Sequence, residues 1–140
     1  FLAFAGLRRL GLADRVTSLV GEDVMLPAVG QGAICIESRA GNDTINALLA
    51  AIHHGDTADC VRAERSFLAA LDGSCRTPIA GLARLDGDTL RLRGQVLTPD
   101  GGEAETIEAS GGRGEAEAIG TRAGEAVRAR LRPGFFAKGD

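Results

Sequence analysis

Residues 71–78, LDGSCRTP, decide how this chain folds, because they end an amphipathic helix and begin a strand. Gly73 and Ser74 are small residues suited to a tight turn, and Pro78 restricts the backbone where the chain leaves that turn. The turn places the thiol of Cys75 beside an arginine side chain. Positive neighbours favour the thiolate, which is the nucleophilic form of cysteine. The stretch therefore predicts a reactive cysteine at a helix-to-strand junction.

The residues around this turn predict an α+β unit, a three-stranded antiparallel sheet with helices on one face. The helix before the turn begins at Asp56 and is expected to stop at Gly73. Cys60 and Phe67 belong to its apolar stripe, whereas Glu64 falls on an exposed arc. Three strands are expected at residues 79–85, 90–96 and 103–109, and a last helix spanning 119–131 follows a glycine-rich linker at 111–114.

The first 54 residues do not close into a domain of their own. Helices are expected at residues 3–12 and, capped by Asn42 or Asp43, at 43–52. LPAVGQG at residues 26–32 is not regular helix, because it holds one proline and two glycines. Residues 33–39 predict a strand whose partners the neighbouring sequence does not supply. We therefore expect exposed apolar surface around Ile34 and Ile36.

Composition narrows the class of protein. The 140 residues are 44% hydrophobic and 25% charged with a net charge of −3, and no apolar run approaches the ~20 residues of a membrane span. Three cysteines without CxxC spacing argue against a disulfide framework or a zinc site and favour a cytoplasmic, reducing setting. The acidic balance disfavours nucleic-acid binding. The chain does not begin with methionine, which leads us to expect a missing upstream part.

Four segments resemble the C-terminal part of the porphobilinogen deaminase (hydroxymethylbilane synthase) family, in the family's order and spacing. They are AGLRRLGL at residues 5–12, LPAVGQGA at 26–33, AERSFL at 63–68 and LDGSCRTPIA at 71–80. The combination of LPAVGQGA with a downstream GSC-x-x-PI is highly specific, although neither half would be alone.

The resemblance implies a transferase of haem and tetrapyrrole biosynthesis. The family condenses four porphobilinogen molecules, with release of ammonia, into the linear tetrapyrrole hydroxymethylbilane. Its primer is a dipyrromethane cofactor held by a thioether to one cysteine, which the match places at Cys75. A soft thiolate suits this attachment, because loss of ammonia leaves an electrophilic methylene-pyrrole. The implied full-length enzyme is a cytoplasmic monomer.

The same resemblance assigns cofactor-binding residues. Arg9, Arg39 and Arg65 match family arginines that contact cofactor or substrate carboxylates, and Gln31 and Gly32 match the loop that lines the active-site cleft. The chemistry is suitable, because every pyrrole unit carries two carboxylates and arginine holds carboxylates with paired donors. No catalytic residue and no metal ligand is assigned to this chain.

The resemblance also divides the chain. Residues 1–25 would end the family's second α/β domain, residues 26–54 would complete its first α/β domain, and residues 55–140 would form the C-terminal cofactor-attachment domain. The family's catalytic aspartate lies upstream of all three segments. We therefore expect this chain to be inactive without the N-terminal portion of the same protein.

Two other functions stay open from the residues. One is a non-catalytic α+β module that holds a polycarboxylate with surface arginines, and the other is a thiol-based redox protein centred on Cys75. Several side chains also have purely structural interpretations. Cys75 could be inert, Arg9 could stabilise a helix terminus, Arg65 could be a solvated charge, and Cys60 and Cys35 could be core residues. His53 and His54 are interpreted as helix-end residues.

Overall fold

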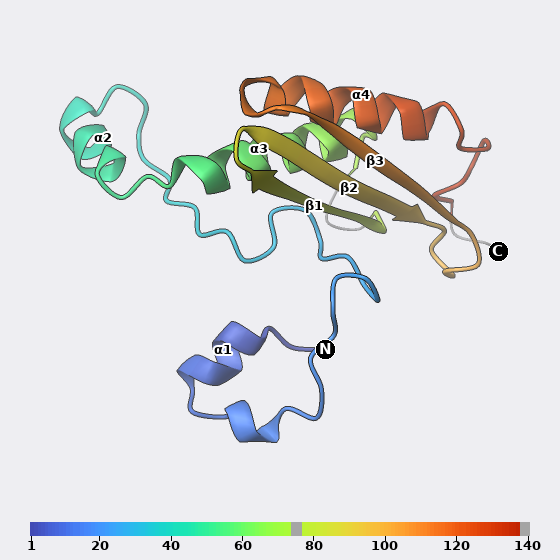
Figure 1. The fold of residues 1–140 in the computed structure, drawn as a ribbon, viewed down its shortest axis with the longest axis horizontal. Coiled ribbons are helices and arrows are strands. Elements are labelled where there is room, and N and C mark those ends of the chain that lie inside the picture. Colours follow the sequence, from blue (N-terminus) through green and yellow to red (C-terminus); the bar gives the residue numbers. More distant parts are fainter. Residues whose placement is uncertain (74–76, 138–140) are drawn as a thin grey trace.

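The computed structural model describes residues 1–73 and 77–137, and its body is an antiparallel sheet in the order β1-β2-β3. Helices α3 and α4 pack together and cover one face of this sheet (Figure 1). The predicted α+β class and three-stranded sheet are therefore confirmed. The strands are β1 (Ile79–Asp86), β2 (Thr89–Leu97) and β3 (Ala104–Gly112), and the helices are α3 (Gly55–Ala70) and α4 (Ala116–Arg128).

The hydrophobic core lies between the two helices and the sheet face that they cover. Side chains alternate along β2, so Leu90, Leu92 and Val96 are buried, while Arg91 and Arg93 lie on the opposite face. A hairpin joins β1 to β2. Gly87 takes a φ of 58° in its two-residue turn, which glycine adopts without steric cost.

Phe67, on α3, lies over two glycines of the sheet. Gly81 of β1 and Gly94 of β2 are directly paired across the ladder. A Cβ added at Gly94 would lie 2.5 Å from the Cζ atom of Phe67 and 2.9 Å from two further carbons of its ring. The two missing side chains therefore form the hollow that holds the fully buried ring.

The two helices approach closely because α4 presents glycines to α3. A Cβ at Gly120 would lie 2.9 Å from the carbonyl carbon of Ala63 and 2.9 Å from the backbone nitrogen of Phe67. A Cβ at Gly124 would lie 2.8 Å from the carbonyl oxygen of Phe67. Each of these contacts is with the backbone of α3, so no rotation of a side chain would relieve it.

The helices that precede α3 stand apart from this body (Figure 1). They are α1 (Phe4–Arg9), the short 3-10 helix η1 (Ala13–Arg15) and α2 (Asp43–Ala50). Asn42 caps α2, since its Oδ1 accepts a hydrogen bond from the backbone N–H of Ile45 at 3.2 Å. Ile34 is 94% exposed and Ile36 is 56% exposed. The exposed apolar surface expected around these two residues is therefore confirmed.

The strand predicted for residues 33–39 is wrong. The segment is irregular, and Cys35 is exposed rather than buried. Within residues 1–73 and 77–137, no strand pairs with this segment. Alternating β-branched residues favour a strand only where a neighbouring strand supplies hydrogen bonds to the backbone.

Both predicted ends of α3 need correction. The N-cap is His54 rather than Asp56, and its Nδ1 accepts a hydrogen bond from the N–H of Thr57 at 3.2 Å. At the other end, the left-handed residue is Asp72, with a φ of 53°, and not Gly73. Aspartate tolerates this conformation better than most residues. Gly73 lies against the side-chain ends of Leu68 and Ile79 instead, because a Cβ there would be 2.5 Å and 2.7 Å from their Cδ1 atoms.

The glycine-rich residues 111–114 are not a linker. β3 continues through Gly112, and the 3-10 helix η2 (Arg113–Glu115) follows directly. Gly111 lies under Ile119 of α4, because a Cβ there would be 3.0 Å from the Cδ1 atom of Ile119. The absence of a side chain at Gly111 therefore allows α4 to begin close to the sheet.

Candidate functional site

The LPAVGQG segment, called here the 26–32 loop, lies along the outer edge of β1. The N–H of Gly81 donates to the carbonyl oxygen of Pro27 at 3.0 Å. A single antiparallel bridge joins Ala28 to Ala80. The loop therefore covers backbone groups of β1 that would otherwise lie at an open sheet edge.

Glu64, on α3, holds the same loop from the other side. Its Oε2 accepts from the N–H of Gly30 at 2.7 Å, and its Oε1 accepts from the N–H of Ala83 at 2.8 Å. The side chain is buried, with an exposed fraction of 5%. The prediction that Glu64 lies on an exposed arc is therefore wrong. Its spacing to Cys60 and Phe67 could have indicated this, because positions i, i+4 and i+7 share one helix face.

Gln31 and Gly32 line a groove of about 400 Å³ between the 26–32 loop, α3 and β1. Two carboxylates also line it, those of Asp56 and Glu64. Among the described residues, the one arginine in its lining is Arg84, which is ion-paired with Glu22. The groove therefore offers little attraction for an anionic group.

Cys60 lines the same groove but packs against the hydrophobic core. Burial raises the pKa of its thiol, and the nearby Glu64 carboxylate raises this pKa further. A raised pKa disfavours the thiolate. Cys60 is therefore a structural residue, as predicted.

The three predicted carboxylate-binding arginines lie on separate elements. Arg9 is in the last turn of α1, Arg39 is the last residue of the irregular segment 33–39 and Arg65 is on α3, and each is exposed. Arg65 lines a different groove from Gln31, together with Arg62 and other residues of α3. Within the two described stretches of chain, none of the three guanidinium groups forms an ion pair or hydrogen bond. The three guanidinium groups therefore have no partner among the described residues, but the structure does not bring them together with Gln31.

Cys75 and Arg76 lie outside the described residues, and the chain just before them makes two polar contacts with the helices. The N–H of Gly73 donates to the carbonyl oxygen of Leu68 at 3.0 Å. Asp72 forms an ion pair of 2.7 Å with Arg128 of α4. The helix end that precedes Cys75 is thus joined to both helices of the body.

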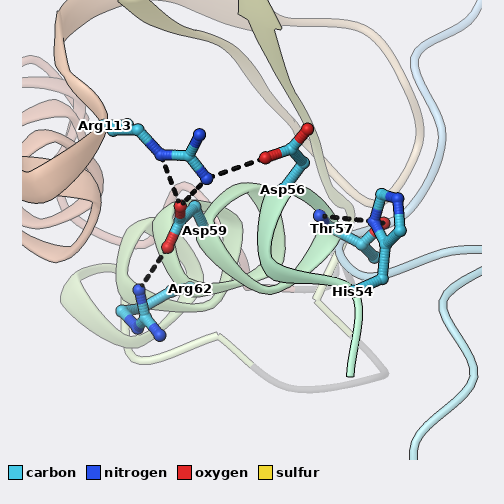
Figure 2. A network of polar contacts seen from close by, with 6 residues as sticks. All are labelled: His54, Asp56, Thr57, Asp59, Arg62 and Arg113. Carbon is cyan, nitrogen blue, oxygen red and sulfur yellow. Dashed lines mark hydrogen bonds and ion pairs between the residues drawn. The ribbon is translucent and has the colours of Figure 1, made fainter. Parts of the chain in front are cut away.

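A further polar network joins the start of α3 to η2 (Figure 2). Arg113 contacts Asp56 and Asp59 at 2.7 Å each, and Asp59 also pairs with Arg62 at 2.7 Å. Hydrogen bonds from Arg113 and then Arg62 hold the pKa of Asp59 below its ordinary value. Sequence reasoning missed this role of Arg113, because the two aspartates that it contacts lie more than fifty residues away.

Comparison with known proteins adds the identity of the chain's family. The family model described as "Porphobilinogen deaminase, C-terminal domain" matches residues 58–129. The chain belongs to the porphobilinogen deaminase family. A second model, described as the dipyromethane cofactor binding domain of porphobilinogen deaminase, matches residues 1–47. The family named from its motifs is thereby confirmed.

Two curated porphobilinogen deaminases illustrate the similarity. The proteins of Nitrobacter hamburgensis and Nitrobacter winogradskyi are each 50% identical to the chain over 135 residues. Each match covers 96% of this chain but 43% of the relative. The chain thus spans less than half the length of the deaminases that it matches. In the described residues, no helix combines the length and the apolar character that a membrane span needs.

The two family models bear on the site differently. The model whose description names the cofactor covers Arg9, Gln31, Gly32 and Arg39. Cys75 and Arg65 lie within the C-terminal model instead. A dipyrromethane cofactor is therefore established for the family, while the attachment atom is a prediction from the LDGSCRTP motif.

Proposed function

We propose that this chain is the cofactor-bearing part of an enzyme that condenses four porphobilinogen units into hydroxymethylbilane with release of ammonia. The main support is the 50% identity to porphobilinogen deaminases across 96% of the chain. The 26–32 loop belongs to one half of the specific motif combination, and α3 is the helix that precedes the other half, residues 73–79. They are also joined in space, through Glu64 of α3.

In this proposal the thiolate of Cys75 is the attachment point for the dipyrromethane. Attachment forms one carbon–sulfur bond as the carbon–nitrogen bond to ammonia breaks, so no oxidant or reductant is required. Cys60 is a poor alternative because its thiol pKa is raised by burial. Cys35 is exposed but lies in an irregular segment outside the motif.

The open guanidinium groups suit an anionic cofactor and its growing product. Arg9, Arg39 and Arg65 are exposed and make no ion pair within residues 1–73 and 77–137, so their donors can hold carboxylates in pairs. Other arginines have structural partners; Arg132, for example, pairs with Glu103 at 2.8 Å. Three other arginines, Arg8, Arg15 and Arg122, are also exposed and form no ion pair among the described residues. The choice of Arg9, Arg39 and Arg65 therefore rests on the family motifs.

The division into segments 1–25, 26–54 and 55–140 is part of the proposal. It is supported by the separate packing of the sheet and helices after residue 55 and by the isolation of α1 and α2 (Figure 1). The acid that assists loss of ammonia would then lie outside this chain. We also place the whole enzyme in the cytoplasm as a monomer.

Mass spectrometry of the native protein isolated from its source tests the proposal. We expect a covalent adduct of two pyrrole units on Cys75, its loss in Cys75→Ser and its retention in the matched control Cys35→Ser. An adduct that persists in Cys75→Ser would refute this attachment site. A native protein without any adduct that still binds carboxylates would instead favour the non-catalytic binding module.

A further inference from the structure

We propose that Glu64 is a positioning residue that fastens the 26–32 loop to the C-terminal unit and so sets the orientation of Gln31. This inference begins from the chain's one buried carboxylate among residues 1–73 and 77–137. The role of Glu64 in catalysis rests on the proposed function, but the attachment of the loop by Glu64 does not.

The contacts of Glu64 link three elements that are far apart in sequence. The carboxylate belongs to α3, accepts from Gly30 in the loop, and accepts from Ala83 in β1. In the described residues no cation forms an ion pair with it. Its burial is therefore offset by the two charge-assisted hydrogen bonds to backbone N–H groups.

A buried carboxylate is an unusual choice if packing alone is required. An apolar residue of similar volume would fill the same space without the cost of removing a charge from water. Each carboxylate oxygen instead accepts a hydrogen bond from a different segment. Oε2 accepts from the loop, and Oε1 accepts from the sheet. The side chain thus performs a connection that an apolar residue could not make.

The loop needs such a connection next to Gln31. Gly30 and Gly32 flank this residue with positive φ values of 69° and 84°. Both glycines have open space around them, so contacts with neighbouring side chains do not hold their backbone. Glycine has the greatest backbone freedom. Two backbone hydrogen bonds close turns within the loop, from Gln31 to Ala28 at 3.0 Å and from Ala33 to Gly30 at 3.2 Å, and the bond from Gly30 to Glu64 ties these turns to α3 one residue before Gln31.

Amide hydrogen exchange measured by NMR on the 140-residue chain tests the fastening. In the unsubstituted protein, the N–H of Gly30 should exchange far more slowly than that of the exposed Gly41, for which no hydrogen bond is found in the described residues. Equal protection factors for the two amides, which compare each observed exchange rate with the intrinsic rate of that amide, would overturn the proposal. This comparison needs no variant, so it does not depend on whether a substituted chain folds.

The substitution Glu64→Gln then tests the role of the carboxylate. An amide side chain accepts at one oxygen where an ionised carboxylate accepts at two, so either Gly30 or Ala83 loses its acceptor. Exchange at that amide should accelerate about 10- to 100-fold, as expected for one lost hydrogen bond to a charged group. The matched control is Glu125→Gln, an exposed position on α4. Equal acceleration of core amides such as that of Leu92 would indicate a merely structural role and overturn the proposal.

Kinetics of the native enzyme test the link to function. Glu64→Gln should lower kcat about tenfold relative to Glu125→Gln with a smaller change in KM, since a misoriented loop still allows binding. If exchange changes as expected but kcat does not, the positioning role is refuted. If the unsubstituted enzyme does not consume porphobilinogen, the proposed function fails, and the exchange data still decide whether Glu64 fastens the loop.

Discussion

The close approach of α3 and α4 predicts a large penalty for adding one methyl group at Gly120. In Gly120→Ala, the new Cβ would lie 2.9 Å from the carbonyl carbon of Ala63 and 2.9 Å from the nitrogen of Phe67, and closer still to the carbonyl oxygen of Ala63. Real Cβ atoms essentially never come within 3.0 Å of a non-bonded heavy atom of a residue elsewhere in the chain. Because all three atoms are backbone, the two helices must separate.

The size of the effect follows from two opposing terms. Overpacking a well-filled core costs about 1–3 kcal/mol, and a backbone contact with no side chain able to yield belongs at about the upper end. Alanine is better than glycine in a helix interior by about 1 kcal/mol, which offsets part of this cost. The net expectation is a loss of about 2 kcal/mol in the free energy of unfolding.

Urea denaturation followed by far-UV circular dichroism measures this loss, since the chain has no tryptophan or tyrosine for fluorescence. With a urea slope of about 1–2 kcal/mol/M, the midpoint should fall by about 1–2 M. The matched control is Gly55→Ala in the first turn of α3, where a Cβ would meet nothing within 4 Å. Its midpoint should stay the same or rise slightly. A Gly120→Ala midpoint at or above that of the unsubstituted chain would refute the backbone contact between α3 and α4.

Two further predictions concern the core and the polar network. Phe67→Ala should lower the free energy of unfolding by about 3–5 kcal/mol, because it empties the hollow over Gly94. The control Phe1→Ala, at a fully exposed position, should change this free energy by less than about 0.5 kcal/mol. Equal urea midpoints for the two variants would contradict this prediction. Asp59 has a folded-state pKa below its ordinary 3.8, so its contribution is present above that pH and is lost as the pH falls through the lower folded value. Asp59→Asn should therefore lose less stability than the unsubstituted chain between about pH 5 and about pH 3, and an equal loss in both would count against the role of Asp59.

The family motifs predicted the candidate site only in part. They identified the family and pointed to Cys75, Gln31 and the arginines, because such motifs are contiguous in sequence. They could not show that Gln31 and Arg65 line different grooves. They also could not show that Glu64 reaches Gly30, since the two residues are thirty-four positions apart.

Local interactions explain what the sequence by itself determined. The apolar stripe of α3, the choice of Asn42 or Asp43 as the cap of α2 and the positions of the three strands each depend on residues a few positions apart, and the structure agrees with these predictions. Their energies are set by nearby backbone and side-chain atoms, so a short window of sequence contains the information.

Only the tertiary structure decided the remaining features. Residues 33–39 have the pattern of a strand, yet they stay irregular because strand formation depends on a neighbouring strand. Glu64 is charged, yet it is buried because two backbone N–H groups from distant segments meet its oxygens. Gly120 is a poor helix former, yet it occurs mid-helix because the backbone of α3 occupies the space of its missing side chain. In each case the deciding atoms come from parts of the chain that only folding brings together.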